Sequence, residues 1–262
     1  MKTAMSHDAF TIAAAVNNEK VLEQNLLLSP NLRNGGRNQL LFKRNCTSAS
    51  HAYNSVIDEA DNDIIIFAHQ DIYLPETWLG DLNRCLTFLG VADPNWGVLG
   101  CFGSTRDAHG GLGRVYTTGI GQLGRRLTRP EPIETLDEAI LIIRKSSGLR
   151  FDPELPHFHL YGTDICMAAR HRGMANYAFQ GYFVHNTDQL LTLPREFYQC
   201  YRYVRRKWAA YLPIYTACIT ITRLNGECYR KRVSDAAQQM LGLLGRPERR
   251  VEDPRPFAAM GL

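Results

Sequence analysis

Residues 63–68, Asp-Ile-Ile-Ile-Phe-Ala, constrain the fold more than any other part of the sequence. The segment is an almost continuous apolar run and does not alternate between apolar and polar residues. A strand of this kind is buried on both faces, which is typical of the centre of a parallel sheet covered by helices. The segment therefore favours an α/β domain.

Strand-like and helix-like segments alternate along the rest of the chain, which predicts a mostly parallel, mixed α/β sheet flanked by helices. Residues 103–130 are rich in glycine and polar side chains and predict a loop or a loose hairpin near a site. Further strands are expected at residues 10–16, 39–43, 98–102, 133–144 and 177–185. Helices are expected at residues 19–28, 47–60 with Thr47 as the cap, 75–90 with Gly90 as the end, and 161–172.

The chain has 262 residues, which suits one α/β domain with an appendage. None of its seven cysteines forms a C-x-x-C pair and several stand within apolar runs, so we expect buried thiols in a reducing compartment. The first residues lack the apolar core of a signal peptide, and no apolar run reaches the length of a membrane span. These features predict a cytoplasmic protein.

Positive charge is concentrated toward the C-terminal end. From Arg195 onward there are 13 Lys and Arg residues against 6 Asp and Glu, whereas the preceding residues carry 17 against 20. We therefore divide the chain into a body, residues 1–190, and a basic helical C-terminal extension, residues 191–262.

Arginines and aromatic residues are interleaved in the first part of this extension. Phe197, Tyr201, Val204 and Trp208 follow helical spacing, and the leading interpretation is a helix that packs on the body with its arginines in water. A second interpretation is peripheral contact with the inner face of a membrane, because basic residues flank an apolar stretch too short to span it. A third is a nucleic-acid surface.

Polar residues follow the buried segment directly, at His69-Gln70-Asp71. Ligands of open α/β sheets bind beyond the carboxyl ends of the strands, so a histidine and a carboxylate two residues apart at such an end can face one divalent metal ion. The competing interpretation is a strand end whose polar residues merely meet solvent.

Two further residues are candidates for chemistry. Asp164 lies at the start of the predicted helix 161–172, where it is either a general base or a first-turn carboxylate stabilised by the helix dipole. His185 ends an apolar run and joins a site only if the sheet carries it to Asp71. The glycines at positions 100, 103, 110, 111 and 113 form no dinucleotide fingerprint or P-loop, and the chain contains no G-x-S-x-G motif, which argues against a dehydrogenase, a P-loop ATPase and an α/β-hydrolase.

Several longer stretches carry a family resemblance. These are NCTSASHAYNSVIDEADNDIIIFAHQDIYLPETW, NWGVLGCFG, GLRFDPELPHFHLYGTDICMAARHRG and YFVHN, within roughly residues 10–187. Together they resemble glycosyltransferase family 2-like proteins with the GT-A fold, and most of all the subgroup related to the streptomycin-biosynthesis glycosyltransferase-like domain. The resemblance implies transfer of a sugar, with inversion, from a nucleotide-diphosphate donor to an acceptor hydroxyl.

The resemblance also implies roles for single residues. The D-x-D metal motif of the family falls on His69-Gln70-Asp71, with His185 completing a site for Mn²⁺ or Mg²⁺. Asp164 falls on the acidic motif that supplies the base, and Asp137, with Glu134, either reaches the acceptor side or belongs to a solvated strand edge. Contacts with the nucleotide sugar are implied for Val16, Asn17, Asn18, Ser48, Asn54, Gln70 and Asp71.

The acceptor implied by the resemblance is a saccharide, a lipid-linked or small molecule, or a macromolecule. Two other functions stay open. One is a non-catalytic module that binds nucleotide sugar or carbohydrate, because His69 stands where the family has a carboxylate. The other is a glycosyltransferase that acts on modified DNA, which requires the basic extension to bind a duplex.

Overall fold

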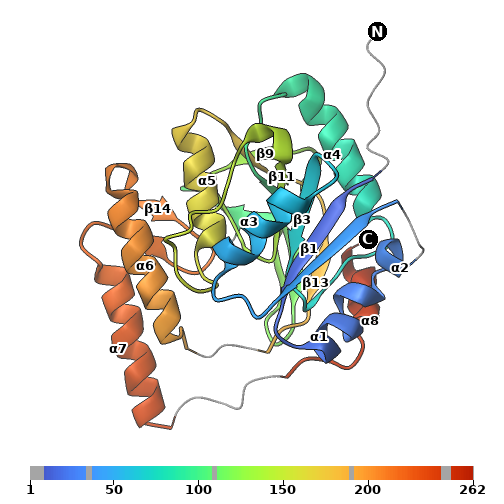
Figure 1. Ribbon diagram of the computed structural model, residues 1–262. Coiled ribbons are helices and arrows are strands. Elements are labelled where there is room, and N and C mark those ends of the chain that lie inside the picture. The colour runs from blue at the N-terminus through green and yellow to red at the C-terminus, as the bar shows by residue number, and fades with distance from the viewer. Residues whose placement is uncertain (1–8, 34–36, 108–110, 189–191, 243–248, 262) are drawn as a thin grey trace.

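The computed structural model describes residues 9–33, 37–107, 111–188, 192–242 and 249–261. Its centre is a mixed seven-stranded sheet with the strand order β2-β1-β3-β11-β5-β12-β9 (Figure 1). The predicted mixed α/β class is therefore confirmed. The strands are β1 Thr11–Val16, β2 Gln39–Arg44, β3 Ile64–Ala68, β5 Leu99–Gly100, β9 Glu131–Ile133, β11 Ile140–Arg144 and β12 Asn176–Ala178.

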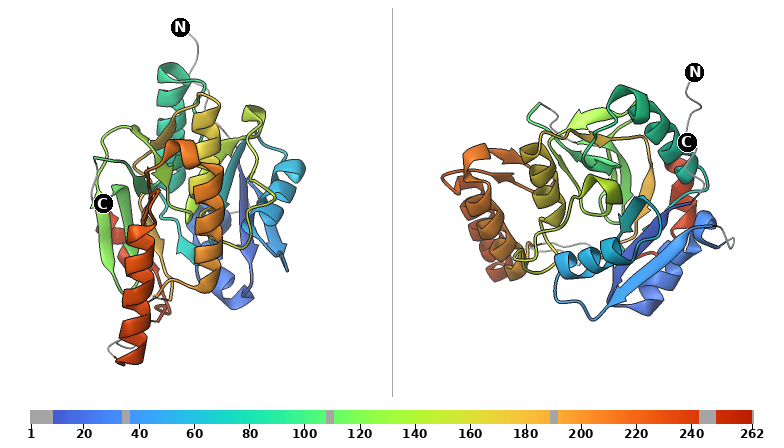
Figure 2. Two further views of the ribbon diagram at one scale, coloured as in Figure 1. Left: turned by 90° about the vertical axis from the view of Figure 1, so that its left-hand side faces the viewer. Right: turned by 45° about the horizontal axis from the view of Figure 1, so that its top comes forward.

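The helices cover both faces of this sheet (Figure 2). The longer ones among the described residues are α1 Glu19–Gln24, α3 Ala49–Glu59, α4 Trp78–Ala92, α5 Tyr161–His171, α6 Arg195–Lys207 and α7 Gly226–Met240. Short helical turns are η1 Leu26–Leu28, α2 Pro30–Arg33, η2 Lys145–Ser147, η3 Ala209–Tyr211, α8 Arg255–Ala258 and η4 Ala259–Gly261.

Strand β3 is buried on both faces, as the apolar run predicted. Ile65 and Phe67 belong to the core between the sheet and helices α3 and α5, whereas Ile64, Ile66 and Ala68 belong to the core on the side of α1 and α4. All five residues are at most 1% exposed. A strand with this burial cannot alternate apolar with polar side chains, which is why its sequence reads as one run.

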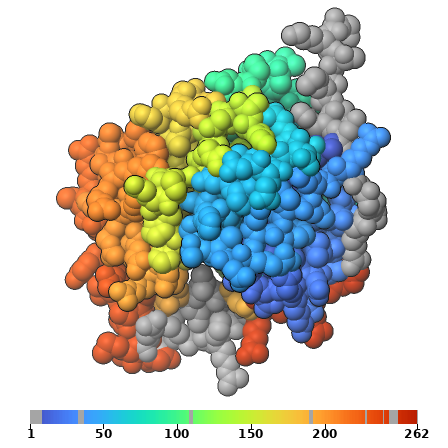
Figure 3. All heavy atoms as spheres, viewed as in Figure 1, coloured from blue at the N-terminus to red at the C-terminus, as the bar shows by residue number. Residues whose placement is uncertain are grey.

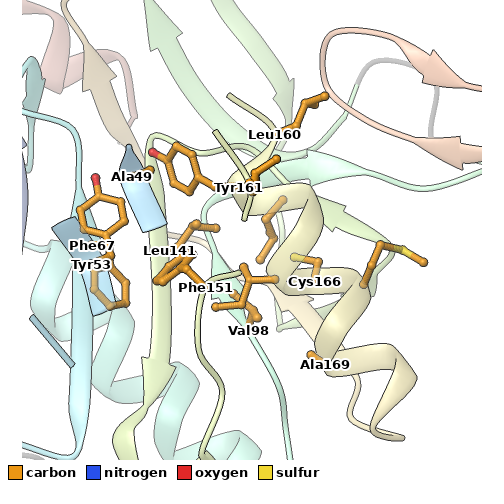
Figure 4. Packing of buried hydrophobic residues seen from close by; sticks show 14 of the residues in the cluster. Ala49, Tyr53, Phe67, Val98, Leu141, Phe151, Leu160, Tyr161, Cys166 and Ala169 are labelled. Carbon is orange, nitrogen blue, oxygen red and sulfur yellow. The ribbon is translucent and has the colours of Figure 1, made fainter. Parts of the chain in front are cut away.

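An aromatic cluster fills the core beneath the carboxyl end of β3 (Figure 4). The Phe67 ring lies 4.8 Å from the Tyr53 ring and 5.1 Å from the Phe151 ring, centroid to centroid, and the Tyr161 ring lies 5.6 Å from that of Tyr53. Offset and edge-on contacts of this kind stabilise a core beyond the area they bury. The cluster therefore gives the first turn of α5, which contains Tyr161, a fixed position beside β3.

Three parallel strands end at the same edge of the sheet. β1 runs parallel to β2, with Val16 opposite Arg44, and parallel to β3, with Ala13 opposite Phe67. The residues that follow these strands are Asn17, Asn45 and His69. They consequently lie along one edge, where ligands of α/β sheets bind.

A second, six-stranded sheet continues from this edge. Its order is β10-β6-β7-β13-β4, and β8 pairs with β7. β4 and β13 are antiparallel neighbours with His185 opposite Ile72, so the strand pairing brings His185 beside Asp71. The strands are β4 Ile72–Tyr73, β6 Phe102–Ser104, β7 Leu112–Thr117, β8 Gly121–Arg125, β10 Thr135–Leu136 and β13 Phe183–His185.

The first part of the basic extension packs on the body. Phe197, Tyr201 and Val204 on α6 are buried in the same core as α3 and α5, which confirms the leading interpretation of this helix. A two-stranded sheet of β14 Ile214–Tyr215 and β15 Thr220–Ile221 follows. Figure 3 shows α6 and α7 on one flank of the molecule. The boundary at residue 190 stays a prediction, and no described helix is long and apolar enough to cross a membrane.

Residues 249–261, called the C-terminal arm below, lie on the other flank, where α8 packs against β13 (Figure 1). The Phe257 ring stacks on the Tyr116 ring of β7, with centroids 4.5 Å apart. The Tyr182 hydroxyl donates a hydrogen bond to the Phe257 carbonyl, and Arg114 donates one to the Met260 carbonyl. These contacts fix the arm against the second sheet.

Some predicted details were wrong. Ser48, not Thr47, caps α3, because the Ser48 hydroxyl accepts the His51 amide hydrogen. Helix α4 continues past Gly90, which has open space around its Cα, to Ala92. The predicted strands 98–102 and 177–185 are each divided between the two sheets. The hairpin predicted within residues 103–130 is confirmed as β7 and β8.

All seven cysteines are free thiols, as predicted. Four of them are buried among apolar residues, and Cys218 is exposed. Burial raises the pKa of the Cys85 and Cys166 thiols to about 12, so these groups behave as small apolar side chains.

Candidate functional site

A cavity of about 410 Å³ opens at the carboxyl ends of β1, β2 and β3. Its position is the one that the parallel topology predicts for a ligand. Asp71 is the only acidic side chain among its described lining residues. The lining residues are Ala15, Val16, Asn17, Lys43, Asn45, Cys46, Tyr53, His69, Gln70, Asp71, Phe158, Tyr161 and Arg250.

His69 and Asp71 line this cavity, and with His185, which is not among the lining residues, they form a cluster whose possible ligand atoms all lie within 4.8 Å of one another. Asp71 Oδ1 lies 3.4 Å from His185 Nε2 and 4.0 Å from His69 Nδ1. The cluster joins the end of β3 to the end of β13. The structure thus brings together the three residues that the sequence predicted as metal ligands.

Tyr161 determines the orientation of the His69 ring. Its hydroxyl lies 2.7 Å from His69 Nε2 and donates a hydrogen bond of 3.1 Å to the Glu138 backbone carbonyl. A neutral His69 that carries its hydrogen on Nε2 satisfies both contacts, because the Tyr161 oxygen then accepts from Nε2 while the hydroxyl hydrogen goes to Glu138. In this tautomer the lone pair of Nδ1 faces Asp71, as metal binding requires.

The charges of the cluster are strongly coupled. Burial opposes ionisation of Asp71, but His185, His69 and Arg250 outweigh it and hold the Asp71 pKa well below its usual range. Burial lowers the pKa of His69 and favours its neutral form. Burial opposes the charge on His185 too, yet the Asp71 carboxylate raises the His185 pKa above the ordinary histidine value. Without a metal, His185 and Asp71 therefore form an ion pair.

The donor set fits a divalent transition ion. Ligand atoms that bind one ion at about 2.0–2.2 Å lie roughly 3–3.5 Å apart, so the two distances to Asp71 Oδ1 require only a small contraction. Two imidazoles and one carboxylate suit such an ion better than Mg²⁺, which prefers oxygen ligands. The hydrogen bond from His69 to Tyr161 is the outer support that metal-binding histidines usually have.

Gln70 links the ends of β1 and β3. Its Oε1 accepts the backbone amide hydrogens of Asn17 and Asn18, each over 3.1 Å, and its Nε2 donates to Asn17 Oδ1. Val16, Asn17 and Gln70 line the cavity, whereas the Asn18 side chain caps α1 by accepting from the Val21 amide. Three of these four residues predicted to hold the nucleotide sugar thus face the cavity, and Asn18 supports its wall.

Ser48 and Asn54 were predicted to contact the nucleotide sugar, but neither lines this cavity. Ser48 is the cap of α3, and Asn54 makes two hydrogen bonds with the backbone of Phe151, over 2.8 and 3.0 Å. Both residues border a separate hollow of about 450 Å³ beside α3. Their polar groups are used to position this helix.

Asp164 does not have the surroundings of a catalytic base. It is 2% exposed and does not line the cavity. Lys207 Nζ lies 2.8 Å from its Oδ1, and Trp208 Nε1 donates to the same oxygen over 2.7 Å. Burial raises the Asp164 pKa against the opposing effect of Lys207. The Asp164 carboxylate thus joins α5 to the end of α6, and its role as a base stays a prediction.

Asp137 lies closer to the metal-ligand cluster. Its charge raises the pKa of both His69 and His185, although neither effect is the largest on those groups. The Asp137 carboxylate is half-buried and accepts the Ala139 amide hydrogen over 2.9 Å. Glu134 is the other acidic candidate, and its Oε2 lies 3.9 Å from NH1 of Arg170 on α5.

Arg250 is a site residue that the sequence did not predict. This residue of the C-terminal arm lines the cavity, and its guanidinium lies 3.3 Å from Asp71 Oδ2. It is separated from Asp71 by 179 positions, and no hydrophobic pattern in the sequence indicates that the arm returns to the body. Only the stacking and hydrogen bonds of the arm reveal its position.

The chain is similar to a curated protein and to several solved structures. No protein-family model matches the chain. A curated protein of Fuscovulum blasticum, described as "ATP synthase subunits region ORF 6", is 30% identical over 125 residues, which cover 46% of this chain and 50% of that protein. The matched part thus spans half the length of that relative.

One solved structure with a similar fold is GalNAc-T7 with UDP, GalNAc and Mn²⁺. Its TM-score is 0.46 and its identity is 10%, and the match covers 68% of this chain and 43% of that one. They also include S. aureus TarS 1–349 in complex with UDP-GlcNAc, with a TM-score of 0.47, 13% identity, and coverage of 76% and 66%. Because both TM-scores lie below 0.5, we base the functional assignment on the geometry of the site.

Proposed function

We propose that this protein is a GT-A-type glycosyltransferase that uses a nucleotide-diphosphate sugar and a divalent ion; Mn²⁺ is the first candidate, because the family resemblance implies Mn²⁺ or Mg²⁺ and the two imidazoles disfavour Mg²⁺. The observation that carries the proposal is the His69-Asp71-His185 cluster at one end of the cavity beyond β1, β2 and β3. A metal-ligand set at that edge of an α/β sheet suits a ligand that is both a nucleotide and a diphosphate.

The cavity walls suggest where the parts of the donor bind. Val16 and Asn17, at the end of β1, form the wall nearest to Gln70 and are the proposed contacts of the nucleoside. Tyr53 and Phe158 supply aromatic surface, and Lys43 and Asn45 supply polar groups at the end of β2. The diphosphate is placed at His69, Asp71 and His185, because the metal ligands lie there.

The chemistry is a single displacement at the anomeric carbon. The acceptor oxygen forms a bond to that carbon, the bond from the carbon to the diphosphate oxygen breaks with its electron pair, and the acceptor proton passes to a carboxylate. A bound divalent ion supplies positive charge to the leaving diphosphate. Inversion follows from one displacement, and no protein nucleophile is needed.

Asp137 is the proposed base. Of the three candidate bases, Glu134, Asp137 and Asp164, it alone raises the pKa values of the cluster histidines. Asp164 is instead enclosed by a lysine and a tryptophan. General base catalysis contributes about 10²–10⁴-fold to such reactions. Asp137 does not line the cavity, so the proposal requires an acceptor that reaches the β10 side of the site.

A non-catalytic nucleotide-sugar-binding module is the second candidate. It is favoured by the fact that Asp71, a proposed metal ligand, is the only acidic residue among the described cavity-lining residues. Such a protein would bind metal and nucleotide sugar and would release no product.

One experiment separates the two functions. The protein is incubated with a panel of nucleotide sugars, with Mn²⁺ or with a chelator, and release of nucleotide diphosphate is measured with and without a mixture of saccharide acceptors. A glycosyltransferase releases nucleotide diphosphate from at least one donor only when Mn²⁺ is present. Mn²⁺-dependent binding of a donor without any release would support the binding module instead.

A further inference from the structure

The C-terminal arm carries a cation into the candidate site. Arg250 NH2 lies 3.3 Å from Asp71 Oδ2, and Arg250 NH1 forms an ion pair with Asp188. The side chain is 28% exposed and lines the same cavity as His69 and Gln70. The guanidinium therefore lies on the oxygen of Asp71 that the two histidines do not approach.

Asn186 holds the arm at this position. Its Oδ1 accepts the Val251 amide hydrogen and its Nδ2 donates to the Val251 carbonyl, both over 2.9 Å. The Asn186 backbone amide donates to the Asp71 carbonyl over 2.8 Å, so one residue connects the metal-ligand segment with the arm. Asn186 is 1% exposed, and this arrangement gives Arg250 a fixed origin next to the cluster.

The hydrogen bonds of Arg250 are incomplete. Its Nε is buried and has no hydrogen-bond partner among the described residues. A guanidinium has five N–H donors in a fixed fork that matches phosphate oxygens, and a buried donor without a partner is costly. Arg250 therefore lines the cavity with a guanidinium whose donors the described residues do not fully satisfy, which suits an anionic oxygen ligand in the cavity.

We propose that Arg250 binds the diphosphate of the donor. In the donor-free protein it neutralises Asp71, and when metal and donor bind it exchanges Asp71 for a phosphate oxygen. Without diphosphate, Arg250 and the metal compete for Asp71. With diphosphate bound, the metal binds Asp71 and both the metal and Arg250 contact the diphosphate. The inference depends on the proposed function, because the diphosphate belongs to the nucleotide sugar.

This arrangement predicts effects of opposite sign from one substitution. Arg250→Gln removes a positive charge next to Asp71, so Mn²⁺ alone should bind several-fold more tightly. The same change removes a charge-assisted contact, so inorganic pyrophosphate should bind about tenfold or more weakly. Arg250→Lys keeps the charge but lacks the forked geometry of the guanidinium. Its pyrophosphate affinity should lie between those of wild type and Arg250→Gln.

Both affinities are measured by calorimetry on the full chain, with pyrophosphate titrated in the presence and absence of Mn²⁺. Arg255→Gln is the matched control, because Arg255 lies on the same arm, is 56% exposed and pairs with Asp253. Thermal unfolding reports whether the arm still supports the fold. The expected result for Arg250→Gln is a higher affinity for Mn²⁺ and a lower affinity for pyrophosphate. Arg255→Gln should bind both ligands like wild type.

Two results would overturn the inference. If wild type binds Mn²⁺ and pyrophosphate and Arg250→Gln binds pyrophosphate equally well, Arg250 only tethers the arm while the proposed function stands. If wild type binds neither Mn²⁺ nor pyrophosphate, the proposed function fails and the inference fails with it.

Discussion

The Tyr161 hydroxyl lies 2.7 Å from Nε2 of His69 and thereby decides which nitrogen of this histidine faces Asp71. The two residues come from different parts of the fold, since His69 follows β3 and Tyr161 begins α5. The aromatic core beneath them fixes the distance between these two elements. Packing of the core therefore fixes the orientation of the His69 ring at the proposed metal site, with Nδ1 facing Asp71.

Replacement of Tyr161 by Phe should weaken metal binding and leave the fold intact. The ring keeps its contacts with Tyr53 and Phe151, but His69 loses the partner of Nε2 and is no longer held in one orientation. Loss of such outer support typically reduces metal affinity by about 10–100-fold. Mn²⁺ affinity by calorimetry and thermal unfolding are the two measurements.

Tyr177→Phe is the control for this change. It also removes one tyrosine hydroxyl hydrogen bond, to Asp93, but Tyr177 lies on β12, outside the cavity. Its Mn²⁺ affinity should equal that of wild type. If Tyr161→Phe also binds Mn²⁺ like wild type, the assigned role of the hydroxyl is wrong.

Metal affinity should increase with pH. Asp71 raises the pKa of His185 above the ordinary histidine value, so below that raised pKa the metal has to displace a proton from His185. One displaced proton makes the affinity rise by about tenfold per pH unit until His185 is neutral, and the dependence then ends. Calorimetry in two buffers of different ionisation enthalpy counts the released proton. A Mn²⁺ affinity that stays constant from about pH 6 to 8 contradicts the pairing of His185 with Asp71.

Asp164→Asn should reduce stability and leave metal affinity unchanged. The change removes the charge that Lys207 faces and weakens the bond from Trp208, at a cost of about 1.5–3 kcal/mol in free energy of unfolding. Asp58→Asn is the comparison, because Asp58 is 63% exposed in its pair with Arg150, so water screens this pair and its loss should change the free energy of unfolding far less. Chemical denaturation gives both values. An Asp164→Asn protein that keeps its stability but loses turnover would restore Asp164 as the base.

Asp137→Asn should lower turnover by about 10²–10⁴-fold, which is the usual contribution of a general base. Donor affinity should change little, because the base acts on the acceptor proton in the transition state. Steady-state kinetics with the responsive donor, together with donor binding by calorimetry, checks both statements. Unchanged turnover would remove Asp137 from the mechanism.

The sequence predicted the parts of this site that follow from local pattern. The apolar run of β3 places His69 and Asp71 at a strand end, because a strand buried on both faces has to stop where polar residues begin. His185 was a candidate because it also ends an apolar segment. Its position beside Asp71 depends on the register of β13 with β4, a long-range pairing that a single sequence does not specify.

Other parts of the site depend on contacts between distant segments. Asp164 has the sequence context of either a base or a helix-dipole carboxylate, and the choice is made by Lys207 and Trp208, more than forty positions further on. Arg250 lies in a polar segment without periodicity, and the stacking of Phe257 on Tyr116 is what returns it to the cavity. Propensity and spacing contain no information about such tertiary contacts.

Titration of the metal-free protein with Mn²⁺ tests the central claim most directly. Wild type should bind one ion per chain with heat that depends on buffer ionisation, and Asp71→Asn should lose this binding while unfolding at a similar temperature. The claim is contradicted if wild type shows no saturable binding, or if Asp71→Asn binds Mn²⁺ with the affinity of wild type.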